Sequence, residues 1–310
     1  MIRVQDLRKS FGDIRAVNGV SFSVGEGEVF GLLGPNGAGK TTTISILATL
    51  RPADSGQAFV CGHDVFREPE AVRRRIGVVP QELAIYEELT AEQNLDVFGR
   101  LYGLSGAGLK NRIAELLDLS ELTEHARRPV KGFSGGMKRR LNIMIGLVHT
   151  PDVLFLDEPT VGIDAQARSK ILDLIRGMNR QGLTVLYTTH YLEEAEQLCD
   201  RIAVIDHGRL AAIGDREELI TQIGEQDTVR LQVLESLRER LVTNAGSWDG
   251  VAEADVRRGK VQIQCRDGAA VVARLQQWLD SEGQHLEQLE VIRPNLETLY
   301  LKITGRALRE

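Results

Sequence analysis

The sequence of 310 residues contains few cysteines, few aromatic residues and no long hydrophobic run. Its three cysteines, Cys61, Cys199 and Cys265, are odd in number, far apart and not arranged as C-x-x-C, which makes a disulfide framework or a zinc cluster a poor interpretation and favours reduced thiols. The longest apolar stretches, such as residues 143–148, fall far short of the roughly 18 to 20 residues that cross a bilayer. We therefore expect no membrane-spanning segment.

An excess of positive charge and a secretion signal are also missing. Lys and Arg total 38 against 44 Asp and Glu, a net charge of -6, so no nucleic-acid partner is expected, since such domains are usually strongly basic. No basic segment followed by an apolar run and a small-residue cleavage site comes after Met1, so secretion is not indicated. A hydrophobic share of 42% with 26% charged residues is typical of a folded globular chain.

The length argues for two domains. Short β-rich runs at residues 2–7, 20–24 and 29–33 predict an N-terminal antiparallel β subdomain. Strands at residues 76–79, 153–156 and 184–188 then alternate with helices, which indicates an α/β fold with a parallel sheet covered on both faces. A largely helical block at about residues 85–150 is expected as an inserted helical subdomain.

A smaller domain is expected at residues 225–310, after a first domain at residues 1–224. Its predicted order is strand 228–233, helix 234–243, strands 252–257 and 260–264, helix 269–281, strand 286–292 and a terminal helix. The order βαββαβ is that of an α+β ferredoxin-like domain.

A glycine-rich motif between a predicted strand and a predicted helix matches G-x-x-x-x-G-K-[ST] without deviation. Glycines allow backbone N–H groups to surround phosphates, the lysine reaches the β and γ phosphates, and the threonine hydroxyl is a Mg²⁺ ligand. A chance match is a poor alternative because strand and helix flank the motif. The expected ATP-binding set is Gly34, Pro35, Asn36, Gly37, Ala38, Gly39, Lys40, Thr41 and Thr42.

A second motif is an apolar strand, residues 153–156, that ends in Asp157 and Glu158 and resembles a Walker B strand. The carboxyl ends of parallel strands converge where ligands bind, so we expect Asp157 to face a Mg²⁺ held by Thr41. Glu158 is then placed to polarise the attacking water. An isolated Asp-Glu pair would more often be a solvated strand end. Because the phosphate loop is present in the same chain, we favour a Mg²⁺ site over that alternative.

Ser134, Gly135 and Gly136 precede a predicted helix, whose free backbone N–H groups bind anions. Their place ahead of the Asp157 strand resembles the signature sequence of ATP-binding cassette (ABC) proteins. This resemblance covers residues 1 to about 220 and implies the P-loop NTPase cassette fold and ATPase activity.

Single residues extend the resemblance. Gln81 matches the Q-loop, which implies contact with Mg²⁺, with the attacking water and with membrane subunits, and Asp164 ends a D-loop match in which Ile163 replaces the usual Leu. His190 matches the switch histidine at the γ-phosphate. Phe11 matches the aromatic residue, usually Tyr, that stacks on adenine. Taken alone, these would be a surface glutamine, a structural histidine and a packed phenylalanine.

In this family the signature of one protomer closes over the nucleotide held by the other. The resemblance therefore implies a homodimer in which each ATP lies between Lys40 of one chain and Ser134 of its neighbour. Two equivalent composite sites follow, related by a two-fold axis.

Three further features resemble the ATPase subunits of ABC-2 type exporters, the group of daunorubicin-resistance-like proteins: Met137 in the signature, the run at residues 187–203 and the tail at residues 293–305. That resemblance implies a separate ABC-2 type membrane permease subunit, drug, antibiotic or lipid-like cargo, and a place on the cytoplasmic face of the cell membrane. An importer ATPase and a soluble non-transport cassette ATPase are the alternatives. Residues 83–89, after Gln81, are either the permease docking groove or core of the helical subdomain.

Overall fold

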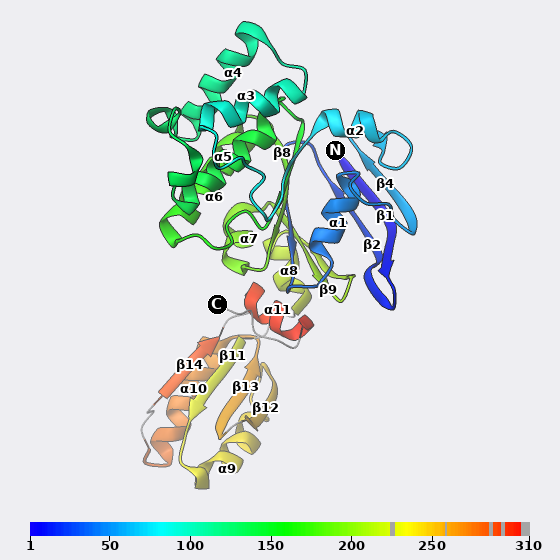
Figure 1. The fold of residues 1–310 in the computed structure, drawn as a ribbon. Helices are drawn as coiled ribbons and strands as arrows, with labels where there is room; N and C mark the ends of the chain where they lie inside the picture. The colour runs from blue at the N-terminus through cyan, green and yellow to red at the C-terminus, as the bar shows by residue number, and fades with distance from the viewer. Residues whose placement is uncertain (224–226, 258, 285–287, 293–294, 305–310) are drawn as a thin grey trace. The chain divides into compact units, whose positions relative to one another are not determined.

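The computed structural model describes residues 1–223, 227–257, 259–284, 288–292 and 295–304 (Figure 1). The chain forms two compact units, Met1–Arg216 and a second one that begins at Glu217. The sequence placed this division after residue 224, so helix α8 (Arg216–Ile223) falls almost entirely in the second unit. Parts of the expected final strand and tail, at residues 286–287, 293–294 and 305–310, lie outside the described residues.

The first sheet of the first unit has the order β2-β1-β4-β5 and is antiparallel throughout. Alternate side chains of β1, namely Ile2 and Val4, are buried, and a bulge before Leu7 restores the inward direction. The expected N-terminal antiparallel subdomain is confirmed for residues 2–7 and 20–24, whose strands are longer than expected, whereas residues 29–33 form β3 of the second sheet. The strands are β1 (Ile2–Phe11), β2 (Ile14–Val24), β4 (Ser55–Val60) and β5 (His63–Asp64).

The second sheet has the order β10-β9-β3-β8-β7-β6, and only the β10-β9 pair is antiparallel. Every residue of β3, β7 and β8 is buried, as expected where both faces of a parallel sheet are covered. The predicted parallel core is confirmed. The strands are β3 (Val29–Leu33), β6 (Ile76–Val79), β7 (Val153–Asp157), β8 (Thr184–Thr189), β9 (Arg201–Asp206) and β10 (Arg209–Gly214).

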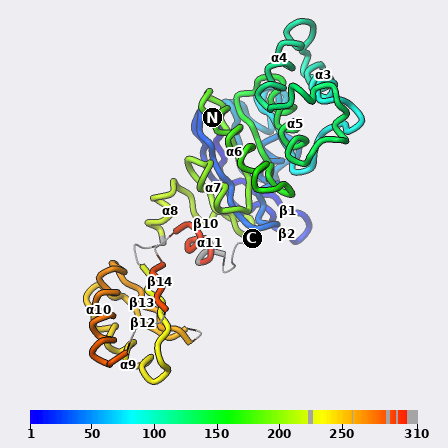
Figure 2. Tube along the Cα trace, turned by 90° about the vertical axis from the view of Figure 1, so that its left-hand side faces the viewer, coloured from blue at the N-terminus to red at the C-terminus, as the bar shows by residue number. Residues whose placement is uncertain are grey.

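Helices α3, α4 and α5 lie together at one end of this unit (Figures 1 and 2) and share a hydrophobic core with α6 and β7. They form the helical subdomain that the sequence predicts. The helices of the first unit are α1 (Lys40–Leu47), α2 (Pro69–Arg75), α3 (Ala91–Leu101), α4 (Gly106–Leu119), α5 (Gly135–Leu147), α6 (Ala165–Arg180) and α7 (Leu192–Leu198), with 3-10 turns η1 (Thr123–His125) and η2 (Val130–Gly132).

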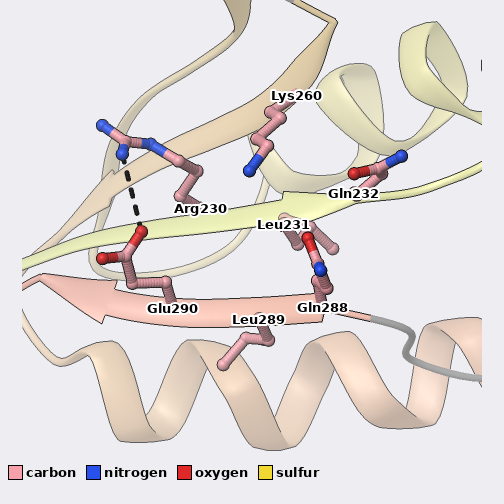
Figure 3. Close-up of a pocket in the computed structure, with 7 residues that line it drawn as sticks. All are labelled: Arg230, Leu231, Gln232, Lys260, Gln288, Leu289 and Glu290. Carbon is pink, nitrogen blue, oxygen red and sulfur yellow. Dashed lines mark hydrogen bonds and ion pairs between the residues drawn. The ribbon is translucent and has the colours of Figure 1, made fainter.

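The second unit has an antiparallel sheet of order β12-β13-β11-β14, and the chain order βαββαβ confirms the ferredoxin-like expectation. Helices α9 and α10 cover one face, on which Val229 and Ile263 are buried. The opposite face is polar: Figure 3 shows a pocket there that is lined by Arg230, Lys260 and Glu290 among others. The elements are β11 (Asp227–Gln232), α9 (Glu235–Ala245), β12 (Val251–Arg257), β13 (Lys260–Cys265), α10 (Gly268–Ser281), β14 (Gln288–Ile292) and α11 (Leu296–Thr304).

Across the described ranges, no helix is both long enough and apolar enough to span a bilayer.

Candidate functional site

The glycine-rich loop connects β3 to α1. Gly39 has φ 108°, and a Cβ at this position would stand 2.2 Å from the carbonyl oxygen of Ala16, so only glycine fits. Helix α1 begins at the next residue, Lys40, and the free N–H groups of its first turn face the loop. The loop therefore has the backbone geometry of an anion-binding site.

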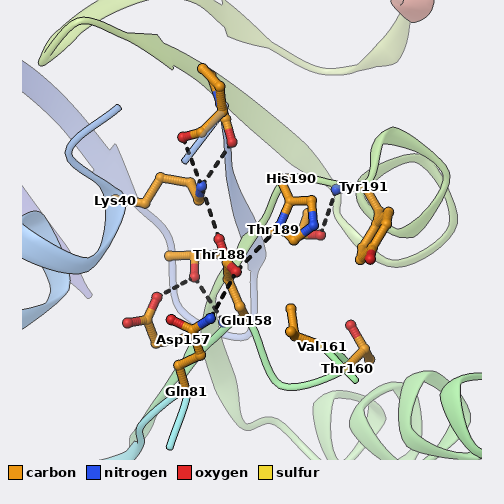
Figure 4. Close-up of polar contacts among 12 residues, drawn as sticks. Lys40, Gln81, Asp157, Glu158, Thr160, Val161, Thr188, Thr189, His190 and Tyr191 are labelled. Atoms are coloured by element: carbon orange, nitrogen blue, oxygen red, sulfur yellow. Dashed lines mark hydrogen bonds and ion pairs between the residues drawn. The ribbon is translucent and has the colours of Figure 1, made fainter. Parts of the chain in front are cut away.

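The amine of Lys40 is buried, with only 4% of the residue exposed. Its Nζ donates to the carbonyl oxygens of Gly34 at 2.7 Å and Pro35 at 3.2 Å, and lies 3.0 Å from Oε1 of Glu158 (Figure 4). Lys40 thus joins the loop to the acidic end of β7.

The end of β7 is held by Thr188 on the neighbouring strand β8. The Thr188 hydroxyl donates to Oδ1 of Asp157 at 2.6 Å and accepts the backbone N–H of Glu158 at 3.0 Å. Glu158 has φ 46°, a left-handed conformation that is uncommon for a residue other than glycine. This backbone turn, together with the bonds from Thr188, sets where the two carboxylates lie.

The Glu158 carboxylate is the centre of the site (Figure 4). Besides Lys40, it contacts Nδ1 of His190 at 3.2 Å and Nε2 of Gln81 at 3.4 Å, both through Oε2. Burial raises the pKa of Glu158, but the contact with His190 and the charge of Lys40 outweigh burial and hold the pKa below its ordinary value. Glu158 therefore carries a negative charge at neutral pH.

The topology explains why these four residues meet. Lys40, Gln81, Glu158 and His190 follow the carboxyl ends of β3, β6, β7 and β8, which are adjacent in the sheet order β3-β8-β7-β6. Ligands of parallel α/β sheets bind at this edge. The structure thus brings together the three expected catalytic residues and the lysine of the phosphate loop.

Oxygen atoms suited to Mg²⁺ are present in the same region. Thr41 is exposed and its hydroxyl makes no hydrogen bond with any described residue, and Oδ2 of Asp157 is likewise unbonded within the described part of the chain. One carboxylate and one hydroxyl fit a magnesium ion, which is typically held by one or two protein oxygens together with substrate phosphates and water. Thr43 differs, because its hydroxyl donates to the Gly39 carbonyl at 2.9 Å.

Ser134 and Asp164 both cap helices. The Ser134 side chain accepts the N–H of Met137 at 3.3 Å at the start of α5, and Asp164 accepts the N–H of Ala167 at 2.8 Å at the start of α6. Ser134 and Gly135 are exposed, so the N-terminus of α5 is open to a ligand. Neither cap contributes to the contacts around Glu158.

Phe11 ends β1 and is 41% exposed. Its ring lies 5.6 Å from Nζ of Lys9 and 5.5 Å from the guanidinium carbon of Arg51, both cation–π distances. Simple sheet packing would bury the ring, and it is not buried.

The sequence left open whether residues 83–89 form a docking groove for the permease or part of the core of the helical subdomain, and the structure differs from residue to residue. Ile85 packs against the large core that includes the helical subdomain, whereas Tyr86 is 51% exposed and contacts the ring of Phe98 at 5.9 Å. Ile85 therefore belongs to the core, and Tyr86 is available to a partner.

Sequence reasoning missed Glu194, which is 1% exposed. Its carboxylate accepts hydrogen bonds from Tyr187 at 2.8 Å, Thr189 at 2.8 Å and Thr160 at 2.6 Å. It thus ties the segment before His190 to the segment after Glu158. The available signal was its place in the first turn of the predicted helix that follows His190.

Similar proteins identify the family. The chain is 43% identical over 312 residues to the linearmycin resistance ATP-binding protein LnrL of Bacillus subtilis (strain 168), with 100% of both chains covered. The chain belongs to the ABC transporter ATP-binding proteins. The family description "ABC transporter" matches residues 17–161. Other relatives are the daunorubicin resistance ATP-binding protein DrrA2 of Streptomyces coeruleorubidus, 42% identical over 98% of this chain and 95% of the relative, and the Nod factor export ATP-binding protein I of Ralstonia nicotianae (strain ATCC BAA-1114 / GMI1000), 40% identical over 100% and 95%.

Solved structures agree with this family. An ATP-binding subunit of an ABC transporter superposes with a TM-score of 0.65 at 32% identity, covering 72% of this chain and 93% of that one. A dimeric cassette, MJ0796, in a post-hydrolysis state bound to ADP and Pi, has a TM-score of 0.63 at 27% identity and covers 69% and 98%. The predicted cassette fold, ATP binding and ATPase activity of this ABC protein are confirmed. Proteins of this family form dimers and work with membrane permeases.

Proposed function

We propose that this ABC protein is the ATP-hydrolysing subunit of an ABC-2 type export system, in which a separate permease subunit carries a drug, an antibiotic or lipid-like cargo. The observation that carries the proposal is the Glu158 carboxylate with Lys40, Gln81 and His190 gathered on it. The names of the relatives, which refer to linearmycin resistance, daunorubicin resistance and Nod factor export, support export over import.

The residues have distinct roles in this proposal. The loop at residues 34–42 binds the phosphates of ATP, with Lys40 at the β and γ phosphates. Thr41 and Asp157, with Gln81 beside them, hold Mg²⁺, which neutralises charge on the phosphates when bound. Glu158 orients and polarises the attacking water, and His190 contacts the γ-phosphate. Catalysis of this kind is mainly positioning and charge neutralisation.

The signature completes the site in a second copy of the chain. Ser134, Gly135 and Gly136, with Asp164 at the start of α6, face the nucleotide held by the partner protomer. The exposed N-terminus of α5 and the dimeric structure among the solved relatives support this arrangement. Binding of two ATP molecules closes the dimer, and hydrolysis opens it.

Phe11 stacks on the adenine through its exposed ring. The exposed Tyr86, close in sequence to Gln81, contacts the permease. The chain is then peripheral on the cytoplasmic face of the cell membrane, held there by that permease.

Drug susceptibility tests the export function. We expect a host strain that lacks this chain to become more sensitive to antibiotics such as linearmycin and daunorubicin, to which the named relatives confer resistance, and we expect the wild-type chain to restore resistance. Lys40→Ala, which removes the amine that meets the phosphates, should fail to restore it. Lys110→Ala is the matched control, because Lys110 is exposed on α4 and outside the site.

Two results would contradict the proposal. Restoration of resistance by Lys40→Ala would separate resistance from ATP hydrolysis. Unchanged drug sensitivity with impaired uptake of a nutrient would favour an importer. Co-purification of the tagged chain from membranes, followed by identification of the bound permease, tests the partner directly.

A further inference from the structure

Arg139 on α5 is a buried cation for which the described residues provide no anionic partner. The residue is 6% exposed, and within the described part of the chain no carboxylate forms an ion pair with it. Burial lowers the pKa of Arg139 from its ordinary value, yet an arginine stays protonated in proteins. A buried charge is unfavourable unless hydrogen bonds compensate it, and an apolar side chain of similar volume often does as well or better for stability. Its presence therefore indicates a role beyond packing.

Among the described residues, the guanidinium of Arg139 bonds only to backbone carbonyls. Its Nη1 donates to the carbonyl oxygen of Gln81 at 2.8 Å and to that of Pro80 at 3.4 Å, and its Nη2 donates to that of Val161 at 3.3 Å. These carbonyls belong to two segments that are far apart in the sequence. A planar guanidinium suits this arrangement because its donors are held in a fixed fork.

Other residues of α5 hold the same first segment. Oδ1 of Asn142, three residues after Arg139 and on the same helix face, accepts the N–H of Ala84 at 3.1 Å. Helix α5 also packs directly on β6, since a Cβ at Gly77 would stand 2.1 Å from the carbonyl oxygen of Gly146. Helix α5 therefore packs on β6 and holds the segment that follows it at residues 80, 81 and 84.

Both segments bonded by Arg139 lead to the hydrolysis site. The side chain of Gln81 reaches Oε2 of Glu158 at 3.4 Å. The Val161 N–H donates to the Glu158 carbonyl at 3.3 Å, at the left-handed turn that aims the Glu158 carboxylate. One guanidinium is thus bonded to the backbone on both sides of the contact between Gln81 and Glu158.

We propose that Arg139 is a positioning residue for ATP hydrolysis, which holds Gln81 against Glu158 by bonding the backbone of both segments to α5. Arg139 acts through Gln81 and does not contact the phosphate loop. The inference rests on the proposed function, because the contact matters only if this site hydrolyses ATP.

A double-mutant cycle on the purified chain tests the proposal. We expect Arg139→Met to lower kcat about tenfold and to leave the KM for ATP within about twofold, since the phosphate loop is untouched. Gln81→Ala should lower kcat by a similar factor. If Arg139 acts through Gln81, the kcat of the double variant should be about that of the slower single variant. The two losses of kcat should then not multiply to about a hundredfold. Multiplying effects, or an Arg139→Met variant with wild-type kcat, would overturn the proposal.

The neighbouring arginine provides a matched control. Arg140 pairs with Glu121 at 2.9 Å and touches neither segment, so Arg140→Met should leave kcat within about twofold of wild type. If Arg139→Met does not fold, the same cycle is measured with Arg139→Lys, which keeps the charge but has a single ammonium in place of the fork. Additive behaviour of Arg139→Lys and Gln81→Ala is then the refuting result.

A parallel variant separates this inference from the proposed function. Wild-type turnover in Glu158→Gln would refute the assigned hydrolysis site itself. Loss of turnover in Glu158→Gln, combined with independent effects at Arg139 and Gln81, would refute only the positioning role of Arg139.

Discussion

Replacement of Glu158 by glutamine is the most informative single change, because it removes a charge and leaves the shape. The carboxylate lies 3.0 Å from Nζ of Lys40, 3.2 Å from Nδ1 of His190 and 3.4 Å from Nε2 of Gln81. Glutamine is as long as glutamate, and both residues adopt the left-handed φ of 46° at this position equally well. We therefore expect Glu158→Gln to fold with its neighbours in place.

The expected magnitude follows from the role of the carboxylate. A positioned acid or base contributes about 10²- to 10⁴-fold to rate, which is about 3 to 5.5 kcal/mol at about 1.36 kcal/mol per factor of ten. We expect kcat for ATP to fall by that factor. ATP binding should persist or strengthen, because the substitution removes the negative charge that lies beside Lys40.

Phosphate release measures kcat, and size-exclusion chromatography with ATP and Mg²⁺ measures the dimer. The variant should accumulate as an ATP-stabilised dimer, while wild type returns to monomer as ATP is consumed. Glu121→Gln, an exposed carboxylate that pairs with Arg140 and Lys170, is the control and should behave as wild type. Wild-type turnover in Glu158→Gln would refute the assigned role. Equal losses of ATP binding and turnover would show that the carboxylate is structural.

Three other predictions concern pH, the partner surface and the adenine. The folded-state pKa of Glu158 lies below its ordinary value of 4.5, so its ionised form stabilises the fold above that pH, and this contribution is lost as the pH falls through the folded-state pKa. The melting temperature of wild type should therefore exceed that of Glu158→Gln at pH 7, and this difference should narrow below about pH 4.5. A difference that widens in acid would contradict a lowered folded-state pKa of Glu158. Tyr86→Ala should weaken co-purification with the permease and leave the ATPase rate of the purified chain unchanged. Ile85→Ala should instead lower the melting temperature, because Ile85 packs in the core. If both variants lowered the melting temperature equally, Tyr86 would belong to the core as well. Phe11→Ala should raise the KM for ATP by about two- to tenfold at constant kcat, as expected for the loss of a ring contact of about 0.5 to 1.5 kcal/mol; an unchanged KM would exclude stacking.

Local patterns predicted most of the cassette. The strands of the parallel core are continuous apolar runs, and the phosphate loop is a contiguous motif, so both could be read along the chain. The hairpin of β9 and β10 was missed. Its two turn residues, His207 and Gly208, both have positive φ, which is the backbone conformation of a tight hairpin turn. The sequence before this turn was interpreted only as a segment that resembles the family, and no strand was predicted there.

The network behind the site was also missed. Arg139 lies within the basic run at residues 138–140 of α5, and Glu194 lies on a helix rich in acidic residues, so both resemble solvated side chains in the sequence. The burial of Arg139 results from α5 packing on the segment after β6, which is far from it in the chain. Glu194 is buried because α7 packs against β8, its neighbour in the chain, and because Thr160, which is distant in the sequence, bonds to its carboxylate.

The sequence by itself determined the chemistry of this ABC protein, because a phosphate loop and an acidic strand end depend on contiguous residues and their short-range geometry. Only the tertiary structure decided which groups meet. The order β3-β8-β7-β6 brings Lys40, Gln81, Glu158 and His190 to one edge, and the buried Arg139 bonds the backbone of Gln81 and that of Val161, which follows Glu158. The physical reason is that a hydrogen bond at 3 Å depends on strand order and helix packing, which arise from the whole core and not from any single segment.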